Sequence, residues 1–257
     1  MTVLTIVDAC VRDGTGGSPT AVLDDDPALT DGDRRAVPVH AGTSHAAFLG
    51  AGDEVRFFTS EGELTGCGHG TVAAQAVLLD RCGLDEHRGW QRTGGRGFEV
   101  VATRRAEGIE VWFDQGVVRL EQPSTEDIAE VLSALGLVHG HVVRASPGTP
   151  RYLVAVPDRE VLFDLAPDLD RLAQLPVLGC FAYAMTGPGA AAARMFAPAI
   201  GVPEDIANAN STGCLAAHLD AALLRVDQGD VRGFPSTVLA SAEGGRIRVG
   251  GIAVLRD

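Results

Sequence analysis

A glycine-rich turn that runs directly into a helical pattern constrains this chain more than any other feature. The turn is Gly66-Cys67-Gly68-His69-Gly70, and an alanine- and valine-rich stretch predicts a helix over residues 70–81. The first turn of a helix leaves backbone N–H groups unpaired and carries the positive end of the helix dipole. Glycines let a ligand approach the backbone closely. The sequence therefore predicts a small anionic substrate at a helix N-terminus, with His69 beside it.

The same order of elements recurs in the second half of the chain. Strand-like segments lead into a polar turn over residues 204–213, and a helical pattern follows over residues 214–225. We therefore predict an α+β fold of two similar lobes, residues 1–118 and 119–257. The order of elements, rather than residue identity, carries this repeat.

The predicted arrangement gives the two lobes one shared site. The helix N-termini expected at Gly70 and Gly213 would both point into a cleft between the lobes. Two positive helix ends suit an anionic ligand even though the chain as a whole is acidic.

Composition narrows the possible functions. The 257 residues are 46% hydrophobic, and no segment approaches the roughly 18–20 apolar residues of a membrane helix. The net charge of −13 argues against nucleic-acid binding. The five cysteines are odd in number and lack C-x-x-C spacing, which favours reduced thiols in a cytoplasmic protein over disulfides. No metal site is expected, and the close pair His139 and His141 is no exception. No signal peptide is expected either.

The chain contains no lysine. Schiff-base chemistry and covalent attachment of pyridoxal phosphate both require a lysine amine, so both are excluded. The glycine motifs of dinucleotide and nucleoside triphosphate sites are also absent from the sequence. Pyridoxal phosphate is therefore excluded, and neither a dinucleotide nor a nucleoside triphosphate is expected.

Four side chains near the two turns could carry chemistry. His45 and His69 have an ordinary imidazole pKa of about 6.5, which suits a general base or acid, although either could be a hydrogen-bonded structural residue. Asp205 could orient a substrate or cap a helix. Cys67 could be a thiolate at a helix N-terminus or a small buried side chain.

Six segments, in order along the chain, match motifs of one known family. They are Gly17–Val22, Ser44–Phe48, Arg56–Ser60, Cys67–Ala73, Ser146–Val154 and Arg194–Asp205. The last is the most specific, with R-M-F-A-P followed by G-V-P-E-D. Together they resemble the PhzF family, within the diaminopimelate epimerase-like fold.

This resemblance implies two lobes, each a barrel-like mixed sheet wrapped around a central helix. It further implies a homodimer without a cofactor, and an isomerisation that moves a proton across an allylic system in a small carboxylic acid. In the family a glutamate carries the proton, and a histidine and an aspartate assist. His69 and Asp205 occupy the positions of these two residues, whereas His45 stands in place of the glutamate.

Substrate contacts are expected from residues at the two helix N-termini and from the residue before His45. The predicted contacts are Ser44, Gly68, Gly70, Thr71, Asn208, Asn210, Ser211, Thr212 and Gly213. The second anion-binding loop of the family, D-P-A-T-G-S, reads D-I-A-N-A-N here. With His45, this change points to a substrate other than the phenazine precursor.

The preferred function is cofactor-independent movement of a double bond in a small unsaturated amino, imino or carboxylic acid. The lysine-free composition suggests a GC-rich genome, in which such proteins resemble enzymes of antibiotic and other secondary-metabolite pathways. One alternative is a two-thiol racemase, because Cys67–Thr71 also resembles the first cysteine motif of proline racemases. A lyase or C–C hydrolase on the same scaffold, and a non-catalytic binding protein, are the others.

Overall fold

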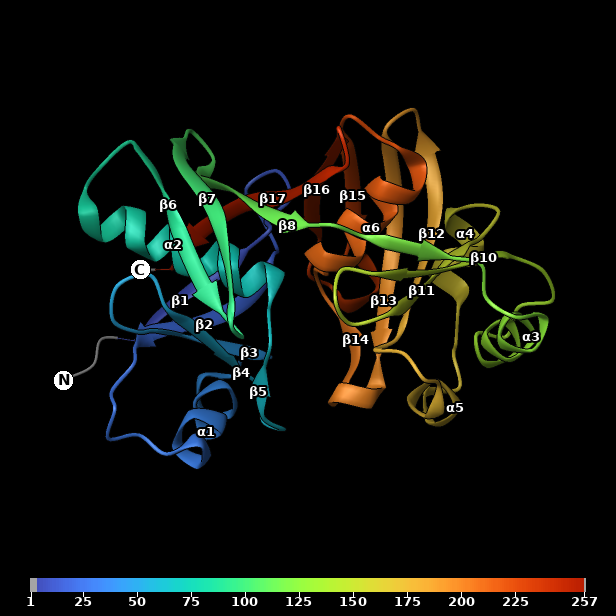
Figure 1. Cartoon of the computed structure of the whole chain (residues 1–257), viewed down its shortest axis with the longest axis horizontal. Helices are drawn as coiled ribbons and strands as arrows, with labels where there is room; N and C mark the ends of the chain where they lie inside the picture. Colours follow the sequence, from blue (N-terminus) through green and yellow to red (C-terminus); the bar gives the residue numbers. More distant parts are fainter. Residues whose placement is uncertain (1–3, 257) are drawn as a thin grey trace.

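The computed structural model describes residues 4–256, which form an α+β fold around one continuous mixed sheet of 17 strands. Figure 1 shows two halves side by side, each with a helix enclosed by strands. This arrangement confirms the predicted fold class. No helix in the described chain is long and apolar enough to cross a membrane.

The first half contains eight strands and two helices. The strands are β1 (Thr5–Ala9), β2 (Ser18–Asp24), β3 (His45–Leu49), β4 (Val55–Phe58), β5 (Glu63–Leu64), β6 (Glu86–Thr93), β7 (Arg96–Arg105) and β8 (Gly108–Gly116), and the helices are α1 (Asp31–Ala41) and α2 (Gly68–Cys82).

The second half contains nine strands, four α-helices and two short 3-10 helices. The strands are β9 (Arg119–Glu121), β10 (His141–Ser146), β11 (Arg151–Ala155), β12 (Cys180–Gly187), β13 (Ala190–Ala197), β14 (Val202–Asp205), β15 (Leu224–Gln228), β16 (Ser236–Glu243) and β17 (Arg246–Leu255). The helices are α3 (Thr125–Ala134), α4 (Arg159–Asp164), α5 (Leu169–Gln174), α6 (Ala209–Leu219), η1 (Pro198–Ile200) and η2 (Asp230–Arg232).

Helix α2 is the centre of the first half. It contacts β1, β2, β3, β7, β8 and β17, and eleven of its fifteen residues are buried. A helix that is covered on nearly all sides belongs inside a protein. Its valines and alanines are small, so strands can pack closely around it. In the second half α6 packs in the same way against β11, β16 and β17.

Two long strands join the halves. Strands β8 and β17 pair antiparallel from Ile109 and Ala253 to Gly116 and Ile247, and β17 also pairs with β1 and β16. Figure 1 shows them crossing the middle of the molecule. The boundary predicted at residues 118 and 119 falls between β8 and β9. Because β17 pairs with β1, the C-terminal strand extends the sheet of the first half.

The predicted start of the second helix is wrong by five residues. Helix α6 begins at Ala209, because the Asn208 side chain caps the backbone N–H of Ser211. Gly213 therefore lies inside the helix rather than at its start. A Cβ at Gly213 would lie 2.1 Å from Oε1 of Gln115, so only glycine fits there. Residues 224–228, at and beyond the predicted helix end, form β15.

A buried ion pair explains the most specific sequence motif. Both guanidinium nitrogens Nε and Nη2 of Arg194 donate to the Glu204 carboxylate, each at 2.9 Å. Nη1 donates to the backbone carbonyls of Leu162, Phe163 and Leu165 at the end of α4. The pair thus holds β13, β14 and α4 together, and it fixes the backbone next to Asp205.

Replacing Arg194 by methionine should lower the free energy of unfolding by about 3–5 kcal/mol, because the Glu204 carboxylate is left buried without its partner. Urea unfolding would measure the loss. Arg88→Met is the matched control, because Arg88 is exposed and its loss should cost no more than about 0.5 kcal/mol. Equal losses in the two variants would contradict a structural role for the buried pair.

Candidate active site

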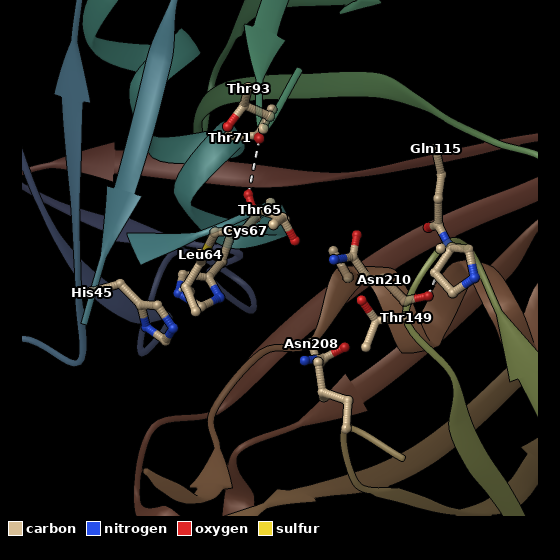
Figure 2. A pocket seen from close by; sticks show the side chains of 18 of the residues that line it. His45, Leu64, Thr65, Cys67, Thr71, Thr93, Gln115, Thr149, Asn208 and Asn210 are labelled. Atoms are coloured by element: carbon tan, nitrogen blue, oxygen red, sulfur yellow. Dashed lines mark hydrogen bonds between the residues drawn. The ribbon is translucent and has the colours of Figure 1, made fainter. Parts of the chain in front are cut away.

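A cavity of about 470 Å³ lies between the two halves. Its walls come from both central helices and from the loops before them, and it includes His45, His69 and Asp205. Figure 2 shows His45 on one side, Gln115, Thr149 and Asn210 on the other, and Cys67 between them. A cavity of this size is within the range of small-molecule sites, about 300–1,000 Å³.

His45 is the first residue of β3, and parallel pairing with Thr20 on β2 fixes its backbone. Its side chain is only 3% exposed, and Nδ1 lies 2.8 Å from the hydroxyl of Ser44. The His45 and His69 rings meet edge to face, with centroids 4.3 Å apart. Burial, together with the neighbouring His69, holds the pKa of His45 well below its usual 6.5. His45 is therefore a neutral imidazole at neutral pH.

His69 is in the first turn of α2, and its surroundings shift its pKa in the opposite direction to that of His45. Its Nδ1 donates to the carbonyl of Ala207 at 3.0 Å, and Nε2 lies 3.5 Å from Sγ of Cys67. Burial alone would lower the pKa of His69. The Cys67 sulfur, the Asp205 carboxylate and the Ala207 carbonyl outweigh burial and raise that pKa to about 9. A base and an acid thus lie in ring contact.

Asp205 ends β14 and is 8% exposed. Its carboxylate accepts a hydrogen bond from Nδ2 of Asn208 at 2.9 Å. Asp205 acts on His69 through its charge, since no hydrogen bond joins the two side chains. Asn208 in turn caps α6, so one short chain of contacts links the acid to the second helix N-terminus.

The N-termini of α2 and α6 meet at the cavity. Gly68 and Ala209 are the first residues of the two helices, and a Cβ added to Gly68 would lie 2.4 Å from the Ala209 Cβ. Glycine is therefore required for the helices to approach this closely. Cys67, the N-cap of α2, makes no side-chain capping bond, so the first-turn N–H groups of α2 keep their capacity for an anion.

The two helix starts share one hydrogen-bond pattern. The Thr71 hydroxyl donates to the Cys67 carbonyl at 2.9 Å and accepts from the Gln91 amide at 3.0 Å. In the second half, the Thr212 hydroxyl donates to the Asn208 carbonyl and accepts from Gln228 at the same two distances. This pattern shows the internal repeat at residue level, and it places Asn208 where the first half has Cys67.

That correspondence bears on the two-thiol alternative. A second thiol related to Cys67 by the repeat would replace Asn208, which has no acid or base chemistry. Cys214 lies within α6, is fully buried and does not line the cavity. Burial raises the pKa of its thiol to about 11. Among residues 4–256, Cys67 is the only cysteine that lines the cavity.

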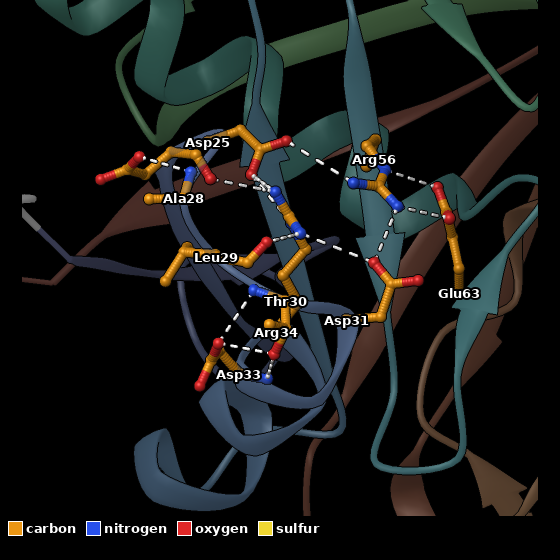
Figure 3. Close-up of polar contacts among 10 residues, drawn as sticks. Asp25, Ala28, Leu29, Thr30, Asp31, Asp33, Arg34, Arg56 and Glu63 are labelled. Atoms are coloured by element: carbon orange, nitrogen blue, oxygen red, sulfur yellow. Dashed lines mark hydrogen bonds and ion pairs between the residues drawn. The ribbon is translucent and has the colours of Figure 1, made fainter.

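Arginines on β4 and α1 form ion pairs close to the start of the glycine-rich turn. Arg56 on β4 pairs with Glu63 on β5 at 2.7 Å and with Asp31 on α1 at 3.2 Å, while Arg34 on α1 pairs with Asp25 at 2.7 Å. Figure 3 shows these contacts as one connected network. Because Glu63 lines the cavity just before the turn, the network anchors the entry to α2.

The structure separates the predicted site residues into two groups. Seven line the cavity: His45, His69, Asp205, Gly68, Thr71, Asn208 and Asn210. Five do not: Ser44, Gly70, Ser211, Thr212 and Gly213. Ser44 bonds to His45, Gly70 packs on Phe57, and the other three lie inside α6. These five support the site rather than face its ligand.

Sequence reasoning missed two polar residues in the cavity wall, Gln115 and Arg151. Gln115, from the crossing strand β8, donates to the carbonyl of Asn210 at 2.9 Å. Arg151, at the start of β11, is buried in the wall beside Thr149. Arg151 lies in the Ser146–Val154 motif, which marked the segment without showing that this side chain is buried in the wall.

One group of side chains in the described chain has a metal-ligand arrangement. The ligand atoms of His45, Cys67 and His69 all lie within 4.8 Å of one another. A thiolate with two imidazoles is a set that Zn²⁺ accepts. The pair His139 and His141, considered in the sequence analysis, is not part of such a group. The His141 ring instead stacks on the His218 ring, at a centroid distance of 5.7 Å. That the enzyme binds no metal stays a prediction.

Comparison with known proteins identifies the family. Residues 7–256 match the model of the phenazine biosynthesis-like proteins, PhzC-PhzF. The chain belongs to this family. An uncharacterized isomerase of Pseudomonas aeruginosa is 31% identical over 256 residues, covering 97% of this chain and 94% of that protein. Other relatives of this chain are also named isomerases, and the chain is an isomerase of the same family.

Solved structures agree with the fold. A predicted epimerase from Pseudomonas aeruginosa has a TM-score of 0.85 at 25% identity, covering 99% of this chain and 96% of that one. A hydroxyproline epimerase from Agrobacterium vitis, solved with trans-4-hydroxy-L-proline, has a TM-score of 0.67 at 13% identity and covers 100% and 89%. The predicted family membership is confirmed.

The close approach of the two helices makes Gly68 sensitive to one methyl group. Gly68→Ala should lower the free energy of unfolding by about 1–3 kcal/mol, because the new Cβ overpacks against Ala209. Ligand binding should weaken as the helix ends separate. Thermal and urea unfolding measure the first effect.

Gly62→Ala is the control, because a Cβ at Gly62 meets nothing within 4 Å. If Gly68→Ala were as stable as this control, the helix ends would not be in contact.

Proposed function

We propose that the chain is a cofactor-independent isomerase that moves a double bond in a small unsaturated amino, imino or carboxylic acid. The observation that carries this proposal is the contact between a neutral His45 and a protonated His69 beside two helix N-termini. General acid–base catalysis requires such a pair of opposite protonation states within reach of one substrate.

The first step is proton removal from an allylic carbon next to the substrate carboxylate. His45 accepts the proton on Nε2 while Nδ1 donates to Ser44. The electron pair of the broken C–H bond delocalises onto the oxygens of the adjacent carboxylate and over the neighbouring double bond, so that negative charge reaches the far end of the allylic system. The N-termini of α2 and α6, whose first residues line the cavity, stabilise this developing charge.

The second step returns a proton to the other end of the allylic system. A C–H bond forms there, the double bond shifts, and the carboxylate regains its original charge. His45 is cationic while it holds the proton, and the neighbouring His69 cation repels that charge. The repulsion favours rapid return of the proton to carbon. Asp205 and Cys67 keep His69 protonated throughout.

The proposal differs from the family's usual chemistry in the charge of the proton carrier. A glutamate becomes neutral when it takes a proton, whereas His45 becomes a cation. A substrate that gains full negative charge in the transition state suits a carrier that gains positive charge. An absence of cofactors and metals, a homodimer, a cytoplasmic location and a role in antibiotic biosynthesis stay predictions.

Deuterium incorporation tests the reaction directly. Candidate unsaturated amino, imino and carboxylic acids are incubated with the wild-type enzyme in deuterated water, and proton NMR follows the vinyl signals. The double bond should move, and deuterium enters the new C–H bond to the extent that the proton on His45 exchanges with solvent before its return. His45→Ala should lose at least about 10²-fold in rate, since a general base contributes about 10²–10⁴.

Two further variants control this result. His40→Ala removes an exposed histidine on α1 and should leave the rate unchanged. His45→Glu supplies the carboxylate of the family motif and should recover part of the activity. Equal activity of His45→Ala and His40→Ala would remove His45 from the mechanism.

The pH dependence of kcat/KM should be bell-shaped. Activity requires neutral His45, whose lowered pKa places the acid limb well below pH 6.5. Activity also requires protonated His69, whose raised pKa places the alkaline limb near pH 9. Initial rates between pH 4.5 and 10 measure both limbs. An alkaline limb near pH 6.5 would contradict the protonated state of His69.

A further inference from the structure

A buried arginine in the cavity wall has no acidic partner. The Arg151 side chain is 2% exposed. Its Nη1 donates to Ser211 Oγ and its Nη2 to the carbonyl of Thr149, both at 3.1 Å. The Nε–H group is buried and makes no hydrogen bond to any described residue. Both acceptors are uncharged, so the guanidinium is solvated by the protein but not neutralised.

Other buried arginines of this chain are treated differently. Arg34 is paired with Asp25 at 2.7 Å, and Arg194 with Glu204 at 2.9 Å. Between residues 4 and 256 no carboxylate lies within ion-pair distance of Arg151. Cys214, the ionisable group that acts electrostatically on Arg151, keeps its proton because burial raises the pKa of its thiol to about 11. A buried cation without an anion is unfavourable, which implies that a ligand supplies the anion.

The position of Arg151 separates it from the proton-transfer residues. Its two acceptors belong to the second half of the chain, and Thr149 lies across the cavity from His45 in Figure 2. The paired helix N-termini, where Gly68 meets Ala209, stand at the boundary between the halves. Through Ser211, in the first turn of α6, Arg151 adjoins one of these helix ends and adds a second positive group to the cavity wall.

We infer that the substrate has a second acidic group, a carboxylate, that binds Arg151 while the reacting carboxylate occupies the helix N-termini. This inference rests on the proposed function in taking the cavity as the substrate site. A planar guanidinium with a free Nε–H matches a carboxylate closely. The substrate class is thus a small unsaturated dicarboxylic acid, with or without an amino or imino nitrogen.

Saturated acids test the second site without turnover. Malonate, succinate, glutarate and adipate are compared with monocarboxylates of the same chain length by isothermal titration calorimetry. At least one dicarboxylate should bind wild type about tenfold or more tightly than its matched monocarboxylate. No preference at any length would overturn the inference. Inorganic phosphate is included, and tighter binding of phosphate than of every dicarboxylate would also overturn it.

Arg151→Met should abolish the dicarboxylate preference, because methionine fills space without charge. Arg96→Met is the matched control: Arg96 also lines the cavity, but its guanidinium donates to the Asp114 carbonyl on the exposed side. The preference should persist in that variant. If Arg96→Met lost the preference and Arg151→Met kept it, Arg96 and not Arg151 would bind the second acidic group, and the inference would be overturned.

Stability distinguishes a ligand-binding arginine from a structural one. Without ligand, Arg151→Met should melt no lower than wild type, because it removes an uncompensated buried charge. A lower melting temperature together with an unchanged dicarboxylate preference would make Arg151 structural. If the methionine variant fails to fold, Arg151→Lys keeps the charge and should retain the preference in weakened form.

The binding data also separate this inference from the proposed reaction. His45→Ala should retain the dicarboxylate preference while losing deuterium incorporation. If wild type prefers dicarboxylates but moves no double bond, only the proposed isomerisation is contradicted. Turnover without preference would count against the role of Arg151 alone.

Discussion

The contact between the first residues of α2 and α6 is the constraint on which the rest of the structure depends. Gly68 and Ala209 can touch only because neither has a side chain beyond a methyl group. Their contact brings two positive helix ends to one cavity, in a chain with a net charge of −13. The crossing strands β8 and β17 hold the halves in this position. An anionic substrate is the ligand that this geometry favours.

The electrostatics of the site follow from which charges are buried together. Burial and the neighbouring His69 lower the pKa of His45 and keep it neutral, whereas Cys67 and Asp205 raise the pKa of His69 and keep it protonated. Arg151 is a buried cation in the far wall, and no residue between 4 and 256 is its acidic partner. The paired helix ends and Arg151 are thus two positive places that a substrate could neutralise.

The sequence predicts what depends on local pattern and leaves out what depends on distant contacts. Helix α2, the presence of His69 and Asp205 at one cavity, and the α+β class follow from the glycine turn and the ordered motifs. The start of α6 does not, because Asn208 caps it from within a polar stretch that also suits a loop. Arg151 is missed because its burial and its lack of a partner arise only when β11 packs against α6.

The protonation states of the two neighbouring imidazoles are the central claim, and nitrogen NMR measures them directly. In uniformly ¹⁵N-labelled protein at pH 7.5, the ring nitrogens of His69 should both show imidazolium shifts. Those of His45 should show one protonated and one unprotonated nitrogen, and His45→Ala and His69→Gln assign the signals. Two neutral rings, or a cationic His45 beside a neutral His69, would contradict the account.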